Sequence, residues 1–237
     1  MGGDGGLRVA RGPVVRVAEP RDVPSIAATL TVATAESRWA RWALPADGRV
    51  QRLTRLHELV AGHRGVATGT TWVTDDVSAV AAWEAPDATP GTAPVPADVA
   101  AALAREVPRL HADRARTLAA TDTVVSAVRP AEPHWWLATV GTRPSARRQG
   151  LAVAVLTPVL QRCDADRVPA AVAVHTWANV RWLRRLGFAV VENSHTTDDQ
   201  LPLYVLVRPP GGADVGADAA MDAGADVDSA GGPSYRG

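Results

Sequence analysis

One strand–turn–helix segment constrains the fold of this chain more than any other feature. The apolar residues 135–140 have the pattern of a strand, and residues 148–163 have the pattern of a helix. The first N–H groups of a helix have no partner inside it and carry the positive end of its dipole. Gly150 and Ala152 leave these groups open to a ligand because their side chains are absent or small. The segment therefore predicts an anion site that suits a pyrophosphate. Its residues are Arg147, Arg148, Gln149, Gly150, Leu151 and Ala152.

Apolar and amphipathic segments alternate along most of the chain. The patterns predict strands at residues 14–18, 70–74, 78–83, 134–140, 170–174, 188–191 and 203–207. They predict helices at residues 22–33, 50–60, 98–120, 148–163 and 180–186, the third of them interrupted at Pro108. We therefore expect an α/β fold with a central mixed, twisted sheet of about six to seven strands flanked by helices.

Composition excludes several classes of function. The 25 basic residues, all of them arginine, balance 25 acidic residues, so nothing indicates binding to nucleic acid or to an anionic membrane. The absence of lysine excludes a Schiff-base or phosphate-loop lysine. Cys163 is the only cysteine, which excludes a disulfide within the chain. With no long apolar run and no secretory signal, we expect a cytoplasmic protein that is a monomer or a homodimer.

The composition changes at both ends of the chain. Residues 1–12 are rich in glycine and are expected to be flexible, and residues 13–208 are expected to form one domain. Residues 209–237 are rich in Gly, Ala and Asp and hold few large apolar residues, so we expect a disordered tail. A helical acidic face that docks on a basic partner is the alternative for this tail.

The histidines do not have the spacing of a metal site. His57 and His63 are six residues apart, which is about 240° around a helix, so they cannot face one ion. We expect no metal.

The segment around residue 140 carries a resemblance to a known family. Residues 136–141, Pro144 and residues 147–152 resemble motif A of the GNAT superfamily of N-acetyltransferases. The order of strands and helices resembles that fold over about residues 15–208. Within the superfamily the chain is most similar to the puromycin N-acetyltransferase group. That narrower likeness rests on Trp72, Val73, Asp75, Asp76, Trp83, Pro86, Asn179, Leu186, Gly187 and Phe188.

The resemblance implies acetyl-CoA as a cosubstrate. Backbone N–H groups of residues 147–152 would hold its pyrophosphate, with the Arg147 side chain adding a charge-assisted contact. Thr139 and Val140 would pair with the pantetheine arm like an added strand. Asn179 matches a position near the thiol end. An acceptor amine would attack the thioester directly, without a covalent enzyme intermediate.

Two positions depart from the resemblance. A tyrosine usual on the short helix is replaced by Leu183, and a glutamate usual on the strand before it is replaced by Ala173. Candidate substitutes are His175, Tyr204 and Cys163, in that order. His175 ends a central strand, where open α/β sheets place ligands, and its ordinary pKa suits a general base. The alternatives are that His175 only hydrogen-bonds a backbone group and that Tyr204 only packs against its neighbours.

Two tryptophans indicate where an acceptor would bind. Trp39 and Trp42 lie between the first two predicted helices, where this family lines its acceptor cleft, so they predict an aromatic pocket. We expect an acetyl-CoA-dependent N-acetyltransferase acting on a primary amine of a small molecule, such as an antibiotic-like aminoacyl compound. The alternatives are a catalytically impaired CoA-binding sensor or partner-binding module, and a peptide N-terminal acetyltransferase.

Overall fold

A seven-stranded mixed sheet organises the protein, as the sequence predicts. The computed structural model describes residues 12–87 and 89–211. In the order β1-β2-β3-β4-β5-β7-β6, neighbouring strands are antiparallel except for β4 and β5, which are parallel. The strands are β1 (Val15–Val17), β2 (Thr71–Thr74), β3 (Ala79–Glu84), β4 (Trp135–Thr142), β5 (Ala170–Val174), β6 (Ala189–His195) and β7 (Pro202–Arg208).

Helices cover both faces of this sheet. One face packs against α7 and α8 through the largest apolar cluster, and the other packs against α1 and α6. The α-helices are α1 (Val23–Thr34), α2 (Arg38–Ala43), α3 (Arg49–His57), α4 (Gly65–Ala67), α5 (Ala97–His111), α6 (Ala115–Val128), α7 (Leu151–Asp166) and α8 (Trp177–Arg185). Short turns of other helix types are η1 (Pro20–Asp22), η2 (Glu58–Arg64), η3 (Ala112–Arg114) and η4 (Pro144–Ala146).

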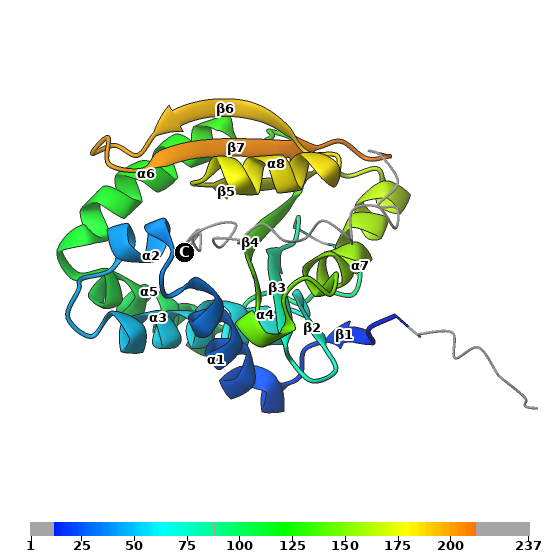
Figure 1. Ribbon diagram of the computed structural model, residues 1–237, viewed down its shortest axis with the longest axis horizontal. Coiled ribbons are helices and arrows are strands. Elements are labelled where there is room, and N and C mark those ends of the chain that lie inside the picture. The colour runs from blue at the N-terminus through cyan, green and yellow to red at the C-terminus, as the bar shows by residue number, and fades with distance from the viewer. Residues whose placement is uncertain (1–11, 88, 212–237) are drawn as a thin grey trace, which may run out of the picture.

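The sheet divides between β4 and β5. Their register pairs only Trp135 with Ala170 and Trp136 with Ala171. Beyond these pairs, β4 continues along β3 to its end, whereas β5 continues along β7. Figure 1 shows β5, β7 and β6 together at the top of the view, with β4 running down toward β3. The far half of β4 therefore has one edge that β5 does not cover, which we call the split edge (residues 137–142).

A helical layer lies beside the sheet. Buried side chains of α2, α3 and α5 form one apolar cluster that includes Trp39, Trp42, Leu53 and Val107. In Figure 1 these helices and α6 gather at the left, next to the ends of β5 and β7. This layer forms the wall of a pocket described below.

Several boundaries differ from the sequence-based expectation. The region predicted as one helix over 98–120 is two helices, because the chain turns at Ala112, where φ is 50°, and α6 runs on to Val128. Pro108 lies in the last turn of α5 and does not end it. The short helix α2 was not predicted; it begins where the Ser37 hydroxyl accepts a hydrogen bond from the Ala40 N–H (3.0 Å).

The expected flexible and disordered ends fall mostly outside the structure. Residues 1–11 and 212–237 lie outside the described residues, so these two expectations stay predictions. Within residues 12–87 and 89–211, no helix has both the length and the apolarity needed to cross a membrane.

Candidate active site

The turn between β4 and α7 presents the start of a helix to solvent. Arg148 and Gly150 have φ of 63° and 74°, so the chain leaves helical geometry there and α7 begins at Leu151 rather than at residue 148. Glycine is the residue for which such a φ costs least. The first N–H that closes the helix is that of Ala154, which donates to the Gly150 carbonyl (3.0 Å). The three N–H groups before it have no partner within the helix, which is the geometry expected of an anion site.

Helix α1 holds this turn in place. Arg143 Nε donates to the Thr29 hydroxyl (2.9 Å), and Arg147 Nη2 donates to the Ala33 carbonyl (3.4 Å). At Gly141 an added Cβ would lie 3.0 Å from the side chains of Ala33 and Leu30. Because α1 approaches β4 this closely, the N–H groups of the turn are supported by two packed elements. The Arg147 side chain is thus tied to α1 as well as being near the turn.

Thr139 and Val140 lie on the split edge. On one side they pair with Ala82 and Ala81 of β3, and on the other they lie beyond the last pair with β5. The Thr139 hydroxyl is buried, and none of the residues that the structure describes gives it a hydrogen-bond partner. Buried polar groups are normally satisfied, so this hydroxyl indicates a position where a polar ligand fits. The split edge and the Thr139 hydroxyl therefore fit an extended ligand arm that carries amide groups.

Helix α8 begins at the end of β5. The Thr176 hydroxyl accepts a hydrogen bond from the Asn179 N–H (3.3 Å), which fixes the first turn and buries Asn179. One turn later, Leu183 is fully buried in the cluster between α8 and the sheet. An apolar side chain thus occupies the position where the resemblance expects a tyrosine hydroxyl.

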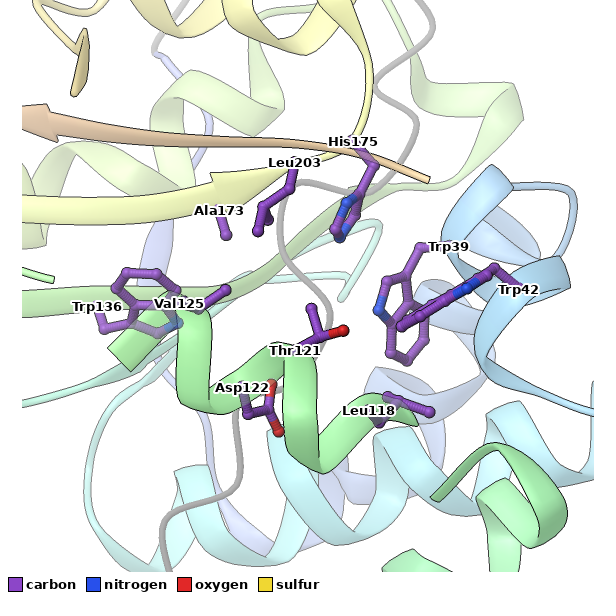
Figure 2. A pocket seen from close by; sticks show the side chains of 10 residues that line it. All are labelled: Trp39, Trp42, Leu118, Thr121, Asp122, Val125, Trp136, Ala173, His175 and Leu203. Atoms are coloured by element: carbon purple, nitrogen blue, oxygen red, sulfur yellow. The ribbon is translucent and has the colours of Figure 1, made fainter. Parts of the chain in front are cut away.

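A small pocket lies on the opposite face of the sheet from α7 and α8 (Figure 2). Its volume is about 30 Å³, close to the space that a single water occupies. The structure brings Trp39, Trp42, Ala173 and His175 together here, from elements that are far apart in sequence. The remaining lining residues are Leu118, Thr121, Asp122, Val125, Trp136 and Leu203.

His175 points into this pocket, but its pKa is not near neutral. Its Nδ1 lies 2.9 Å from the Pro202 carbonyl, so Nδ1 carries the hydrogen and Nε2 is the acceptor. Burial lowers the pKa of His175 to about 4. The expectation of an ordinary pKa is therefore wrong, because the ring is enclosed and holds a backbone group. At neutral pH this histidine is an uncharged hydrogen-bond acceptor.

Tyr204 and His175 lie on opposite faces of the sheet. Tyr204 pairs with Val174 and packs on the α8 side, with its ring centroid 5.8 Å from that of Trp177. His175 follows Val174, and successive side chains of a strand point to opposite faces. The structure therefore does not bring the two candidates together. Cys163 is buried within α7, and burial raises the pKa of its thiol to about 12, so it stays protonated.

Sequence reasoning missed Asp122. It lies on α6, across the pocket from Ala173 and His175 (Figure 2). Burial raises the pKa of its carboxyl to about 7; the nearby Arg129 opposes this shift and Glu84 adds to it. The sequence does carry a signal for this residue, since Asp122 is a single carboxylate between the apolar positions of an amphipathic helix. It was overlooked because the predicted helix ended near residue 120.

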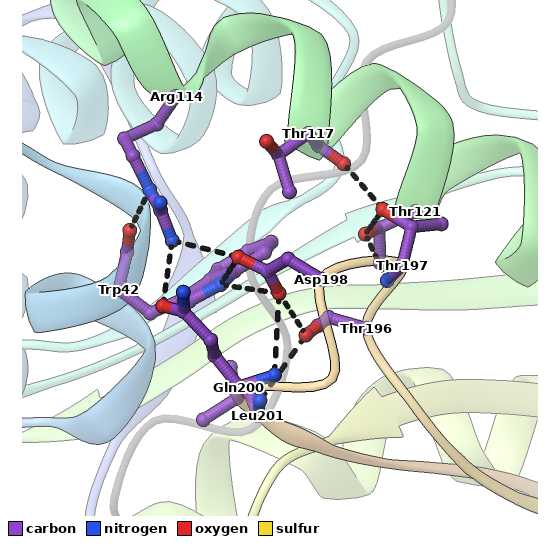
Figure 3. Close-up of polar contacts among 9 residues, drawn as sticks. All are labelled: Trp42, Arg114, Thr117, Thr121, Thr196, Thr197, Asp198, Gln200 and Leu201. Carbon is purple, nitrogen blue, oxygen red and sulfur yellow. Dashed lines mark hydrogen bonds and ion pairs between the residues drawn. The ribbon is translucent and has the colours of Figure 1, made fainter.

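A polar cluster fixes the rim of the pocket (Figure 3). Asp198, in the turn between β6 and β7, accepts hydrogen bonds from Trp42 Nε1 (3.0 and 3.1 Å) and Thr196 Oγ1 (2.7 Å). Arg114 Nη2 donates to Asp198 (3.0 Å), and Arg114 Nε donates to the Trp42 carbonyl (2.8 Å). These bonds hold the Trp42 ring in one orientation, with its edge tied to the β6–β7 turn.

The two histidines of the second predicted helix lie in different surroundings. His57 is buried and its Nε2 lies 3.1 Å from the Thr34 hydroxyl, whereas His63 is exposed. Among the residues that the structure describes, no three or more His, Cys, Asp or Glu side chains form a group that could hold a metal ion.

Comparison with known proteins identifies the fold. No protein-family model matches the chain. A solved structure described as a histone acetyltransferase HPA2 and related acetyltransferase, from Corynebacterium glutamicum, is 24% identical, with a TM-score of 0.59 over 84% of this chain and 97% of that one. An agmatine N-acetyltransferase is 16% identical, with a TM-score of 0.56 over 84% and 100%. A polyamine N-acetyltransferase from Drosophila melanogaster is 16% identical, with a TM-score of 0.52 over 83% and 99%. The chain therefore has the mixed α/β fold of the GNAT N-acetyltransferases.

Proposed function

We propose that the protein is an acetyl-CoA-dependent N-acetyltransferase that acts on a primary amine of a small molecule. The observation that carries this proposal is the split edge, which joins two different sites. At one end of β4 lies the turn that begins α7, which would bind an anion, and across the sheet lies a pocket lined by Trp39, Trp42 and His175. Two of the structures that share the fold are described as acetyltransferases of agmatine or polyamines, which supports an amine acceptor.

The cofactor side would hold acetyl-CoA, which supplies an activated acetyl thioester. The N–H groups that begin α7 would bind its pyrophosphate, with charge support from Arg147 and Arg148. Thr139 and Val140 would pair with the pantetheine arm, and Asn179 would lie near the thiol end. Tyr204 faces this side of the sheet and is the candidate donor of a proton to the departing thiolate.

The acceptor side would orient the amine. The amine nitrogen forms a bond to the carbonyl carbon as the carbon–sulfur bond breaks; the nitrogen loses a proton and the sulfur gains one. Trp39 and Trp42 would flank the amine end of the acceptor, and His175 Nε2 would accept a hydrogen bond from the amine. The finer proposal, an antibiotic-like aminoacyl acceptor, rests on the sequence resemblance.

Calorimetric titration of acetyl-CoA into wild type and Gln149→Glu tests the anion site. Gln149 is exposed in the turn before α7, and the substitution adds a negative charge with almost no change in shape. A carboxylate near a helix start favours folding while it repels a phosphate, so weaker binding would not reflect unfolding. Gln161→Glu, exposed farther along the same helix, is the matched control.

We expect Gln149→Glu to weaken binding about tenfold at low salt and Gln161→Glu to leave it unchanged. Absence of acetyl-CoA binding to wild type would overturn the proposal. Binding without thiol release for any amine would favour the impaired CoA-binding sensor, which Leu183 and Ala173 already suggest as the alternative.

A further inference from the structure

A second, much larger cavity lies behind the acceptor pocket. It has a volume of about 930 Å³ and lies between the α5–α6 hairpin, the end of β3 and residues 85–87 and 92–95. Its walls are mainly apolar, with Val95, Leu103 and Val107 among the larger side chains. Volumes of this size with apolar walls are typical of sites for small organic molecules.

Most charged groups at this cavity are already paired. Glu84 accepts a hydrogen bond from Arg64 Nη2 (3.0 Å) and one from Arg129 Nη1 (3.4 Å). His111, from α5, bonds the Ala43 carbonyl through Nδ1 (2.9 Å) and burial lowers its pKa. Asp87 lines the outer part of the cavity. Arg129, which is paired with Glu84, is the nearby positive charge that opposes the effect of burial on the Asp122 carboxyl.

Asp122 and Leu118 line both the large cavity and the small pocket. The two spaces therefore meet at α6. Across the small pocket, His175 is uncharged at neutral pH, so it does not neutralise the carboxylate. No hydrogen bond or ion pair is found for the Asp122 carboxylate among residues 12–87 and 89–211. Asp122 is thus a carboxylate at the junction of two spaces, available to a ligand.

We propose that Asp122 binds the ammonium group of the acceptor and that the large cavity binds a bulky apolar group attached to that amine. This inference rests on the proposed function and names its acceptor class. An ammonium at Asp122 points through the junction toward Ala173 and the split edge, while the apolar group stays beneath α5 and α6. The ammonium first loses one proton to solvent, and the free amine then loses a second proton as the acetyl group is transferred and the CoA sulfur gains one. The product is a neutral amide, so it lacks the ion pair with Asp122 and is released more easily.

Tryptamine and tryptophol are suitable probes because they share an apolar indole and differ in charge. Their binding is measured by calorimetry, with and without CoA, about one pH unit above the pKa of Asp122 so that the carboxylate is ionised. Asp122→Asn removes the charge and keeps the shape. Ala104→Trp fills the large cavity from α5, and Ala101→Trp, exposed on the same helix and lining neither space, is its control.

We expect wild type to bind tryptamine about tenfold more tightly than tryptophol, and Asp122→Asn to bind the two alike. Ala104→Trp should weaken both ligands and Ala101→Trp neither. An unchanged preference in Asp122→Asn would overturn the ammonium assignment, and equal effects of the two tryptophan variants would overturn the cavity assignment. Failure of wild type to bind either probe would overturn the acceptor class. Because amine binding is measured without acetyl-CoA, these outcomes are separate from the titration that tests the proposed function.

Discussion

Replacing Asp122 by asparagine should change how the stability of the protein depends on pH. Burial raises the pKa of this carboxyl from 3.8 to about 7 in the folded state. The folded protein therefore holds the proton more tightly than the unfolded chain does. The resulting stabilisation is complete below about pH 4 and is lost as the pH rises through about 7. At about 1.4 kcal/mol per pKa unit, the full shift corresponds to about 4 kcal/mol.

The assay is urea unfolding of wild type and Asp122→Asn at about pH 5 and about pH 8. The asparagine is uncharged at both pH values, so the variant escapes the cost of burying a carboxylate. Because Asp122 is half-buried and solvent screens it in part, we expect the advantage of the variant to grow by about 2 kcal/mol between the two pH values. Asp113→Asn, exposed on the same hairpin, should show no such growth. An advantage that is equal at both pH values would refute the reasoning, since it would mean that Asp122 is hydrated like a surface carboxylate.

Two further substitutions test the packing that supports the site. Gly141→Ala should lower the free energy of unfolding by about 1–3 kcal/mol, because its methyl group would lie 3.0 Å from the side chains of Ala33 and Leu30; an unchanged urea midpoint would mean that α1 shifts without cost. Asp164→Asn should lower it by about 3 kcal/mol. Asp164 accepts two hydrogen bonds (2.6 and 2.8 Å) from the fully buried Arg208, and the substitution removes the negative charge from this pair. A loss below about 0.5 kcal/mol on urea unfolding would contradict that account and place the pair in the range of surface ion pairs.

Local patterns predicted the elements whose faces repeat regularly. The apolar run at residues 170–174 is the central strand β5, and residues 135–140 fall within β4. Local conformation was less predictable. The turn before α7 uses a positive φ at Arg148, a residue without the freedom of glycine, so the helix starts three residues later than expected. Likewise, α5 ends at His111 and not at Pro108, because a proline near the end of a helix interrupts few hydrogen bonds.

The candidate site also has some features that the sequence could predict and others that it could not. The strand–turn–helix motif could be predicted because it depends on residues that are adjacent in the chain. The pKa of His175 and the facing of Tyr204 could not, because they depend on burial by α2 and α6 and on the pairing of β5 with β7. Asp122 shows the same limit, since its significance comes from residues far from it in sequence.

The sequence by itself determined the order of the seven strands along the chain, the absence of disulfide and lysine chemistry, and the position of the strand–turn–helix motif. These follow from short-range periodicity and composition. Only the tertiary structure decided that β4 and β5 separate after two pairs, that Asp122 lies across the pocket from Ala173 and that His175 is neutral. The physical reason is that burial and charge are set by contacts between distant segments, whereas periodicity records only which face of each segment is apolar.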